Sequence, residues 1–547
     1  MVSGRTYTIR GFGVSRTPGR PDILRRVRST RILLALTVAG AILRFYGLGH
    51  QGFWFDEANT ALLVKFSPGK MIGLIPQTES TPPLYYCVAW VWSRIFGDGE
   101  AGLRSLSAVC GVLTIPVAWA AARELVSDRA AVLAAALTAF NPLLIWYSQE
   151  ARSYELLVLF TALALLAFAY AVREPSPLAI AAWVIACALA LATHYYAVVT
   201  VAPEAAWLLW EYRRERAVRV GVGLAALCGL ALIPLALSQN STGHDSWIAH
   251  APLNLRLAQI VPQFLLGTGS PLRKPLKFVG FALVLVGLVL LVTRARGDER
   301  RGALLAGGLA ITGFLLSLAF VAAGSDALIT RNIVGLWLPA TIALSGGLAS
   351  TLGSERARGW VGTRGVLQST GRSYSRGGAS RFIGPALGGG LCAIGLTAAI
   401  GVQANYNLQR PNWRPVATAL GPGPAPGADR LILVQHYRTL LPLSLYIPNL
   451  HFLRAPAAHR VSDIYVISIS SPQQPLCWWG AACNLIPSQM QQRYRIRGFH
   501  TAWLRHVEQF TIMLLVSDRP RTVTPTEVAR ALVTTTLPND ELLFQRS

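Results

Sequence analysis

Apolar runs recur along the chain from residue 32 to residue 403, and no other feature of the sequence limits the possible folds as strongly. A helix needs about 20 mostly apolar residues to cross the roughly 30 Å hydrocarbon layer of a bilayer. Runs near that length are typical of transmembrane helices. The predicted fold class is therefore a polytopic α-helical membrane protein. We predict eleven spans, at residues 32–47, 104–122, 131–147, 154–172, 178–194, 196–211, 217–238, 276–293, 303–322, 332–350 and 383–403.

The composition excludes several other classes. Hydrophobic residues make up 52% of the 547-residue chain and charged residues only 14%, whereas a soluble globular protein carries about 25% charged residues. Soluble, fibrous, disordered and small disulfide-stapled proteins do not have this balance.

The net charge of +24 has the sign expected of a nucleic-acid-binding protein, but its distribution favours another explanation. Basic residues gather before the first apolar run and in alternate connections between later runs, where the positive-inside rule places cytoplasmic loops. We predict no nucleic-acid partner, and we expect contact with anionic lipid instead. Residues 1–31 are predicted to be a basic cytoplasmic segment, too long and too basic for a cleaved signal peptide.

The same charge pattern predicts the topology. With a cytoplasmic N-terminus, the connections 48–82, 148–153, 194–196, 239–275 and 323–331 lie on the extracytoplasmic face, and the Gly/Ser/Arg-rich stretch 352–382 is a flexible cytoplasmic loop. Residues 84–97 are apolar but only 14 long, and a full crossing there would reverse every later loop. We interpret them as a tilted or interfacial helix.

Residues 404–547 have the character of a separate extracytoplasmic domain. Three β-branched runs, at 431–437, 464–470 and 510–517, predict strands of a small α/β or α+β domain. An N-capped helix is expected at 410–420.

Two of the seven cysteines, Cys477 and Cys483, flank a tryptophan pair in this last segment and could form a disulfide if it is extracytoplasmic. The other five lie in apolar runs and are interpreted as buried small hydrophobes.

Ionisable residues gather in the connections predicted to be extracytoplasmic. Asp56 and Glu57 follow the first span in the sequence FWFDEAN, which alone would fit a solvated turn. Glu150, Arg152 and Tyr154 lie in WYSQEARSYE, between two spans. An ionisable group at membrane depth costs roughly 2.5 to 3.5 kcal/mol on insertion scales, so such groups normally face a polar cavity.

Three further residues share this predicted face. His194, in THYYA, taken alone fits a packed histidine, and Arg331, in DALITRN, fits a snorkelling anchor. Arg104 allows the same two interpretations. Their convergence with the carboxylates favours one shared polar chamber.

Carboxylates and arginines together suit group transfer from an anionic lipid carrier. Arginine can hold a phosphate leaving group while a carboxylate takes the proton of an attacking hydroxyl. The chain has neither a Walker loop nor a dinucleotide-binding glycine fingerprint, so we do not expect a soluble nucleotide substrate.

The ordered motifs from about Arg44 to Pro448 resemble the bacterial members of the protein O-mannosyltransferase superfamily, of the glycosyltransferase family 39 type, which have the C-class membrane glycosyltransferase fold. The motifs are the Asp56–Glu57 dipeptide, PPLYY (82–86), GLRSLSAVCGVLTIP (102–116), NPLLIWYSQEARSYEL (141–156), THYYA (193–197), the Arg331 helix with WLPA, and RPNWR (410–414).

The resemblance implies transfer of a monosaccharide from a polyprenyl-phosphate donor to an acceptor hydroxyl of a glycan, glycolipid or protein, usually with inversion. Asp56 would be the catalytic base, with Glu57 positioning it or the acceptor, and Arg331 would contact the lipid phosphate. The remaining residues of the donor pocket would be Arg104, Arg152, Tyr154 and His194.

A divalent cation, Mg²⁺ or Mn²⁺, could be held by Asp56 and Glu150, with Glu57 nearby. Many relatives carry Lys or His before the proline pair, where this chain has Thr81, which shifts phosphate recognition to Arg331 and other arginines.

The predicted location is a bacterial plasma (inner) membrane, with an extracytoplasmic active site. Two other functions stay open at this stage, a transporter or flippase for lipid-linked sugars and a scaffold that binds a wall polymer. The absence of repeated halves in the sequence argues against a transporter.

Overall fold

The structure is a computed structural model that describes residues 20–352, 382–434 except 422 and 425, 440–453, 458–469, 494–532 and 541–546. Most of the predicted basic segment 1–31, nearly all of the predicted loop 352–382, and Cys477 and Cys483 lie outside the described residues.

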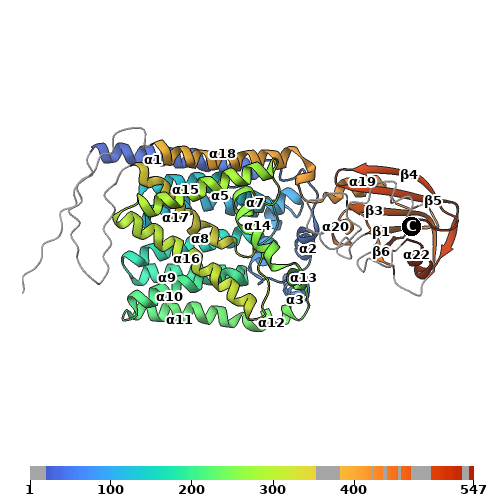
Figure 1. Ribbon diagram of the computed structural model, residues 1–547. Helices are drawn as coiled ribbons and strands as arrows, with labels where there is room; N and C mark the ends of the chain where they lie inside the picture. Colours follow the sequence, from blue (N-terminus) through green and yellow to red (C-terminus); the bar gives the residue numbers. More distant parts are fainter. Residues whose placement is uncertain are drawn as a thin grey trace, which may run out of the picture.

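Helices running side by side form a bundle, with a β-sheet beyond one end of it (Figure 1). Every predicted span coincides with one or two helices. These are α1 (Arg20–Phe45), α5 (Glu100–Leu125), α6 (Asp128–Phe140), α7 (Pro142–Ser148), α8 (Tyr154–Arg173), α9 (Pro177–Thr193), α10 (Val198–Tyr212), α11 (Arg216–Ala231), α12 (Ile233–Asn240), α15 (Arg273–Thr293), α16 (Gly297–Ala322), α17 (Trp337–Ala349) and α18 (Ile383–Ala404).

Seven spans in the described part of the chain are long and apolar enough to cross a membrane, and the bent pair α6–α7 would make an eighth. The other three predicted spans fall on helices that do not meet this criterion. Of these, α9 and α10 have only 17 and 15 residues, and α1 begins in a basic segment. The predicted class, a multi-pass α-helical membrane protein, is confirmed.

The bend between α6 and α7 places the loop that follows α7. Asn141 separates the two helices, and its side-chain oxygen accepts a hydrogen bond from the Leu144 N–H at 3.0 Å, which caps α7. Pro142 then begins α7, a position where its missing N–H costs no helical hydrogen bond. The two helix axes differ by 55°, so α7 carries the loop 149–153 to the end of the bundle near the sheet.

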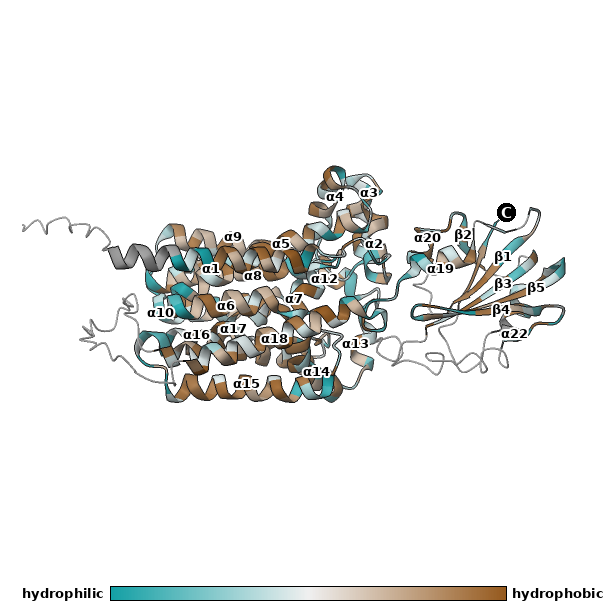
Figure 2. Cartoon of the chain, turned by 90° about the horizontal axis from the view of Figure 1, so that it is seen from above, coloured by the Kyte–Doolittle hydropathy of each residue, from teal (hydrophilic) through white to brown (hydrophobic). Residues whose placement is uncertain are grey.

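Short helices cover the same end of the bundle. They are α2 (Phe55–Leu63), α3 (Pro68–Thr78), α4 (Leu84–Phe96), α13 (Ser246–His250) and α14 (Leu253–Leu266). Figure 2 shows α3 and α4 beside α2, at the end that faces the sheet. At 13 residues α4 does not reach spanning length, in agreement with the short helix predicted at 84–97.

The described residues form a sheet of six strands in the order β2-β6-β1-β3-β5-β4. Among these strands β1 and β3 pair in parallel, and the other neighbouring pairs are antiparallel. The strands are β1 (Asp429–Val434), β2 (Leu450–Phe452), β3 (His459–Ile469), β4 (His500–Val507), β5 (Phe510–Val523) and β6 (Glu541–Gln545), and the helices are α19 (Trp413–Leu420), α20 (Leu440–Ser444) and α22 (Pro525–Leu532). We call these strands and helices the sheet unit.

All three predicted strands overlap observed ones, namely β1, β3 and β5. Alternation places Ile432, Ile467 and Ile512 on the face covered by α19, and their chain neighbours on the face covered by α22. The expected helix at 410–420 is α19, but Asn412 does not cap it with its side chain. Its Oδ1 instead accepts a hydrogen bond from the Gly52 N–H at 2.8 Å, because the bundle end lies against this helix.

Phe55 joins the bundle to the sheet unit. It begins α2, yet it belongs to the same buried apolar cluster as Trp413 and Phe510. The Trp413 ring lies 5.7 Å from the Phe55 ring and 4.5 Å from the Phe510 ring, between centroids. Burial of this aromatic side chain holds the first turn of α2 against the sheet unit.

We expect Trp413→Ala to loosen this contact. Removing a fully buried tryptophan costs about 3–5 kcal/mol, so the sheet unit should unfold at a lower temperature and be cleaved faster by protease in the purified full chain. Trp503→Ala, on edge strand β4, is the control and should have a smaller effect because Trp503 is only half-buried. Equal stability of the Trp413 variant and the unaltered protein would contradict the proposed packing.

Candidate active site

Eight charged residues gather where the bundle meets the sheet unit. They form four arginine–carboxylate pairs, which we call the charged cluster. The pairs are Glu57–Arg104, Asp56–Arg331, Glu79–Arg152 and Glu150–Arg410.

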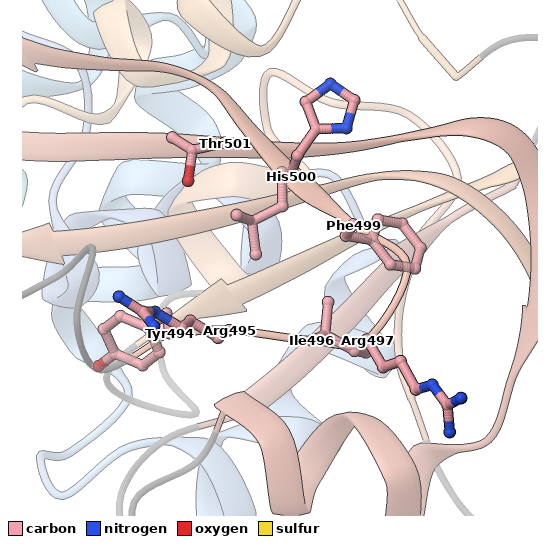
Figure 3. A pocket seen from close by; sticks show the side chains of 8 residues that line it. Tyr494, Arg495, Ile496, Arg497, Phe499, His500 and Thr501 are labelled. Carbon is pink, nitrogen blue, oxygen red and sulfur yellow. The ribbon is translucent and has the colours of Figure 1, made fainter.

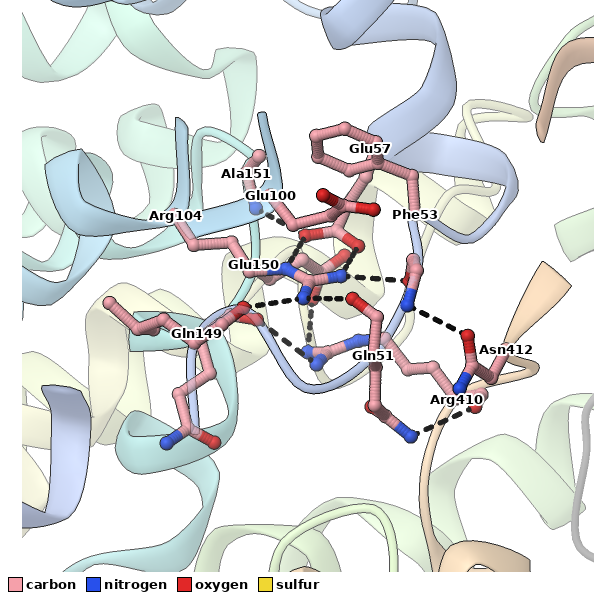
Figure 4. Close-up of polar contacts among 12 residues, drawn as sticks. Gln51, Phe53, Glu57, Glu100, Arg104, Gln149, Glu150, Ala151, Arg410 and Asn412 are labelled. Carbon is pink, nitrogen blue, oxygen red and sulfur yellow. Dashed lines mark hydrogen bonds and ion pairs between the residues drawn. The ribbon is translucent and has the colours of Figure 1, made fainter. Parts of the chain in front are cut away.

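Asp56 and Glu57 lie in the first turn of α2, where the helix dipole favours negative charge. Glu57 is completely buried and accepts two hydrogen bonds from Arg104, at 2.7 Å from Nε and 2.6 Å from Nη2 (Figure 4). The Ala151 N–H donates a third, at 2.8 Å. Both carboxylate oxygens of Glu57 are therefore committed, so this residue can position its neighbour but does not face an acceptor.

Arg104 does not have the role predicted for it. Its guanidinium donates to Glu57 and to the backbone carbonyls of Leu48, Gln51 and Gly52, which uses all five of its N–H groups. Its side chain is only 4% exposed. The prediction that Arg104 lines the donor pocket is corrected, because no N–H group is left for a phosphate; Arg104 fixes the loop before α2.

Asp56 and Arg331 form the most exposed pair of the charged cluster. Arg331 Nη1 lies 3.0 Å from Asp56 Oδ2, although 275 residues separate the two in sequence. The Arg331 side chain is 22% exposed and the Asp56 side chain 16%, whereas no side chain of the other three pairs exceeds 9%. The structure thus brings together the two residues to which the sequence assigned the base and the phosphate contact.

Aromatic rings flank Arg331. Its guanidinium carbon lies 5.8 Å from the Tyr154 ring centroid and 5.2 Å from that of Trp247 in α13. The loop that carries Arg331 is held by Arg256, which binds both oxygens of Asp326 at 2.7 and 2.6 Å. This hydrogen-bonded arginine lowers the pKa of Asp326, so the carboxylate stays charged and the pair stays formed.

The loop 149–153 contacts most other parts of the charged cluster. Arg410 Nη2 donates to Glu150 Oε2 at 2.8 Å (Figure 4). Arg152 Nη1 lies 2.9 Å from both oxygens of Glu79 and 3.3 Å from the Asp56 carbonyl oxygen. Burial raises the pKa of Glu150, an effect that Arg410 opposes.

Arg152, Tyr154 and His194, predicted to line the donor pocket, all lie near the pair Asp56–Arg331. The Tyr154 ring lies 6.1 Å from the His194 ring, between centroids. His194 Nδ1 accepts a hydrogen bond from the Tyr196 N–H at 3.2 Å, so this nitrogen carries no proton. His194 is thus a neutral ring at physiological pH and supplies no cation for a phosphate.

Thr81, the departure noted above, faces inward. Its hydroxyl lies 3.1 Å from the Tyr86 hydroxyl, and its carbonyl accepts from Gln239 at 3.1 Å. The segment around Thr81, just before the proline pair, therefore has a packing role in the structure.

Sequence reasoning missed the roles of Glu79, Arg256 and Arg410. Glu79 adjoins the STPP segment, and Arg410 begins RPNWR, so proximity to these motifs was the available signal. No spacing rule connects Arg410 with Glu150, 260 residues away, because only the fold brings them together.

Four buried polar atoms of the charged cluster have no hydrogen-bond partner among the described residues. They are Glu150 Oε1, Arg152 Nε, Arg331 Nε and Arg410 Nε. Buried polar groups are normally paired, with protein or with ordered water. Their concentration around Asp56 fits a chamber that takes up water or the polar groups of a substrate.

A metal site is not formed by the described residues. No three His, Cys, Asp or Glu side chains among them come together in an arrangement that could hold an ion. Glu57 is occupied by Arg104 and Ala151, and one oxygen each of Asp56 and Glu150 is bound by an arginine. These residues do not fit the predicted divalent cation as they are arranged, and no chemical step is derived through one.

A hollow of about 600 Å³ lies elsewhere, on the sheet unit (Figure 3). It is lined by Leu515 and by residues of the segment 494–501, among them Arg495, Arg497 and His500. No carboxylate lines it, so it has no candidate base. The charged cluster remains the candidate active site.

We expect Arg104→Ala to destabilise the protein by about 3–5 kcal/mol, because it leaves the buried Glu57 carboxylate without its cation. Arg123→Ala breaks the exposed pair with Asp128 and is the control, with a cost of about 0–1 kcal/mol. Thermal unfolding in detergent measures both. If Arg104→Ala left stability unchanged and weakened only donor binding, the scaffolding role would be wrong.

Comparison with known proteins agrees with this architecture. Residues 80–237 match the family model described as dolichyl-phosphate-mannose-protein mannosyltransferase. A search of curated proteins gives no match.

Among solved structures, ArnT from Cupriavidus metallidurans is similar in its apo state, at TM-score 0.53 and 13% identity, and bound to undecaprenyl phosphate, at TM-score 0.51 and 15% identity. Each match covers 89% of this chain and 98% of that chain. The archaeal oligosaccharyltransferase AglB from Archaeoglobus fulgidus matches at TM-score 0.45 and 14% identity, over 73% of this chain, which spans 58% of that one.

Nearly complete coverage of ArnT at low identity shows a shared fold. The chain is therefore a multi-pass membrane protein of the C-class glycosyltransferase fold, as its resemblance to the protein O-mannosyltransferase superfamily predicted.

Proposed function

We propose that the protein transfers a monosaccharide from a polyprenyl-phosphate donor to an acceptor hydroxyl of a glycan, glycolipid or protein, with inversion at the anomeric carbon. The observation that carries this proposal is the partly exposed pair Asp56–Arg331 among otherwise buried charges. Among the described residues of the charged cluster, Asp56 and Arg331 are the pair in which both the carboxylate and the guanidinium side chains are more than 9% exposed.

The proposed reaction is a single displacement. The acceptor oxygen bonds to the anomeric carbon as the bond from that carbon to the phosphate oxygen breaks, and the acceptor proton passes to Asp56. Arg331 stabilises the charge that grows on the departing phosphate. Its Nη1 is the one atom of this guanidinium hydrogen-bonded to Asp56, so other N–H groups remain for phosphate oxygens.

The choice of donor is supported by the family model and by ArnT. That protein has been solved with undecaprenyl phosphate bound, and we extend a polyprenyl-phosphate carrier to this chain by analogy of fold. Trp247 and Tyr154 around Arg331 offer apolar walls beside the phosphate, which would strengthen its electrostatic contacts by excluding water. We place the reaction on the extracytoplasmic face of a bacterial plasma membrane, with the N-terminus in the cytoplasm.

We expect Asp56→Asn to lower transfer about 10² to 10⁴-fold, because the amide cannot accept the acceptor proton. Folding and donor binding should persist, since the amide oxygen can still accept from Arg331. The assay pairs a panel of polyprenyl-phosphate sugars with membrane extracts as acceptors.

The control for this variant is Asp128→Asn, which should retain full transfer. It removes an exposed carboxylate at the start of α6, away from the charged cluster. Near-normal turnover by Asp56→Asn would refute the role of base. Movement of lipid-linked sugar across liposomes without any transfer would favour a transporter instead.

We expect Arg331→Gln to weaken donor use. A hydrogen bond to a charged group contributes about 1.5–3 kcal/mol, so kcat/KM for the donor should fall at least tenfold, while Arg123→Gln should leave it unchanged. Displacement of labelled polyprenyl phosphate measures the affinity for the donor's lipid phosphate directly. Unaltered donor affinity in Arg331→Gln would exclude a phosphate contact.

A further inference from the structure

We propose that Arg410 is a positioning residue, through which the segment leading into the sheet unit holds the loop 149–153 and thereby Asp56. Its effect on catalysis rests on the proposed function, whereas its effect on the loop does not. The sheet unit then helps to complete the active site, in addition to any contact it makes with the acceptor.

Arg410 lies after α18, in the chain segment that enters the sheet unit, but its side chain is buried in the end of the bundle. Nη2 donates to Glu150 Oε2 at 2.8 Å and to the Trp146 carbonyl at 2.9 Å, and Nη1 donates to the Gln149 carbonyl at 3.3 Å. The guanidinium carbon lies 3.9 Å from the Trp146 ring centroid, and the side chain is 7% exposed.

The loop that Arg410 holds contacts both acidic residues in the first turn of α2, Glu57 through its carboxylate and Asp56 through its backbone carbonyl. The Ala151 N–H donates to Glu57 Oε1 at 2.8 Å, and Arg152 donates to the Asp56 carbonyl at 3.3 Å. A shift of this loop would move the first turn of α2, and with it the Asp56 carboxylate. A misplacement of about 1 Å costs about 10²-fold in rate when it disturbs reacting groups.

The same chain segment also holds the residues just before α2. Gln51 Nε2 lies 2.5 Å from Gln409 Oε1, and Asn412 accepts from the Gly52 N–H. A Cβ at Gly52 would lie 2.9 Å from both Asn412 Oδ1 and the Tyr446 hydroxyl, so a larger residue here would push these side chains away. The residues around Arg410 thus contact two separate segments that converge on Asp56.

Lysine cannot replace this arginine. Three acceptor oxygens and a stacked indole surround a planar guanidinium, and an ammonium group offers neither the fork geometry nor the stacking face. Arg414, in the same segment, serves as the matched control because its side chain is 40% exposed where it pairs with Glu100.

The first test is amide hydrogen exchange on the purified full chain. In Arg410→Gln and Arg410→Lys, peptides covering 149–153 and 53–58 should exchange about tenfold faster or more, with α8 unchanged, while Arg414→Gln matches the unaltered protein. Unchanged exchange in both segments would overturn the proposal. If the exchange rate rose uniformly, in α8 as well, the variant would be unfolding, and the positioning role would also be overturned for that variant.

The second test is transfer kinetics. Arg410→Lys should lower kcat about 10²-fold with donor KM within twofold, because the base is misplaced while Arg331 is not. The double variant Glu150→Gln with Arg410→Gln should lose no more transfer activity than the less active single variant, since both residues act through one contact. Full activity of Arg410→Lys beside an inactive Asp56→Asn would refute the positioning role alone. A protein without any transfer would refute the proposed function, and the exchange result would still decide the role of Arg410.

Discussion

The structure depends on one-to-one pairing of arginines with carboxylates where the bundle meets the sheet unit. Each charge would be costly to bury alone, and removing one partner of a buried pair costs about 3–5 kcal/mol. Such pairs therefore form together or not at all. Because the partners come from separate segments, as with Glu57–Arg104 and Glu150–Arg410, the pairing joins the ends of distant helices into one rigid framework.

Within that framework, one pair differs from the rest in a way that matters for chemistry. Arg104 has five acceptors for five N–H groups, so it cannot release any without loss. Arg331 is more exposed, and its Nη1 donates to one carboxylate oxygen, that of Asp56. A phosphate could compete for Arg331 and leave the Asp56 carboxylate to accept a proton. The two arginines therefore differ in how many of their N–H donors the protein already uses.

The sheet unit is joined to the bundle by apolar as well as polar contacts. Phe55, the residue before Asp56, is buried with Trp413 in the core of the sheet unit, and Arg410 holds the loop 149–153, whose Ala151 N–H donates to Glu57, the residue after Asp56. Residues on both sides of the candidate base are therefore fixed by a part of the chain more than 350 positions away. This arrangement explains why the first connection of the bundle and RPNWR belong to one site.

The sequence alone determined the membrane class, the apolar spans and three strands of the last segment, and it identified Asp56 and Arg331 as candidate site residues, because apolar periodicity and charges in unexpected places are local signals. It did not determine how many donors of each arginine the protein itself uses: taken alone, Arg104 and Arg331 allowed the same two interpretations, and Arg410 had no assigned role. Only the tertiary structure decided this, since the availability of a charged group depends on how many acceptors the fold brings to it from other segments.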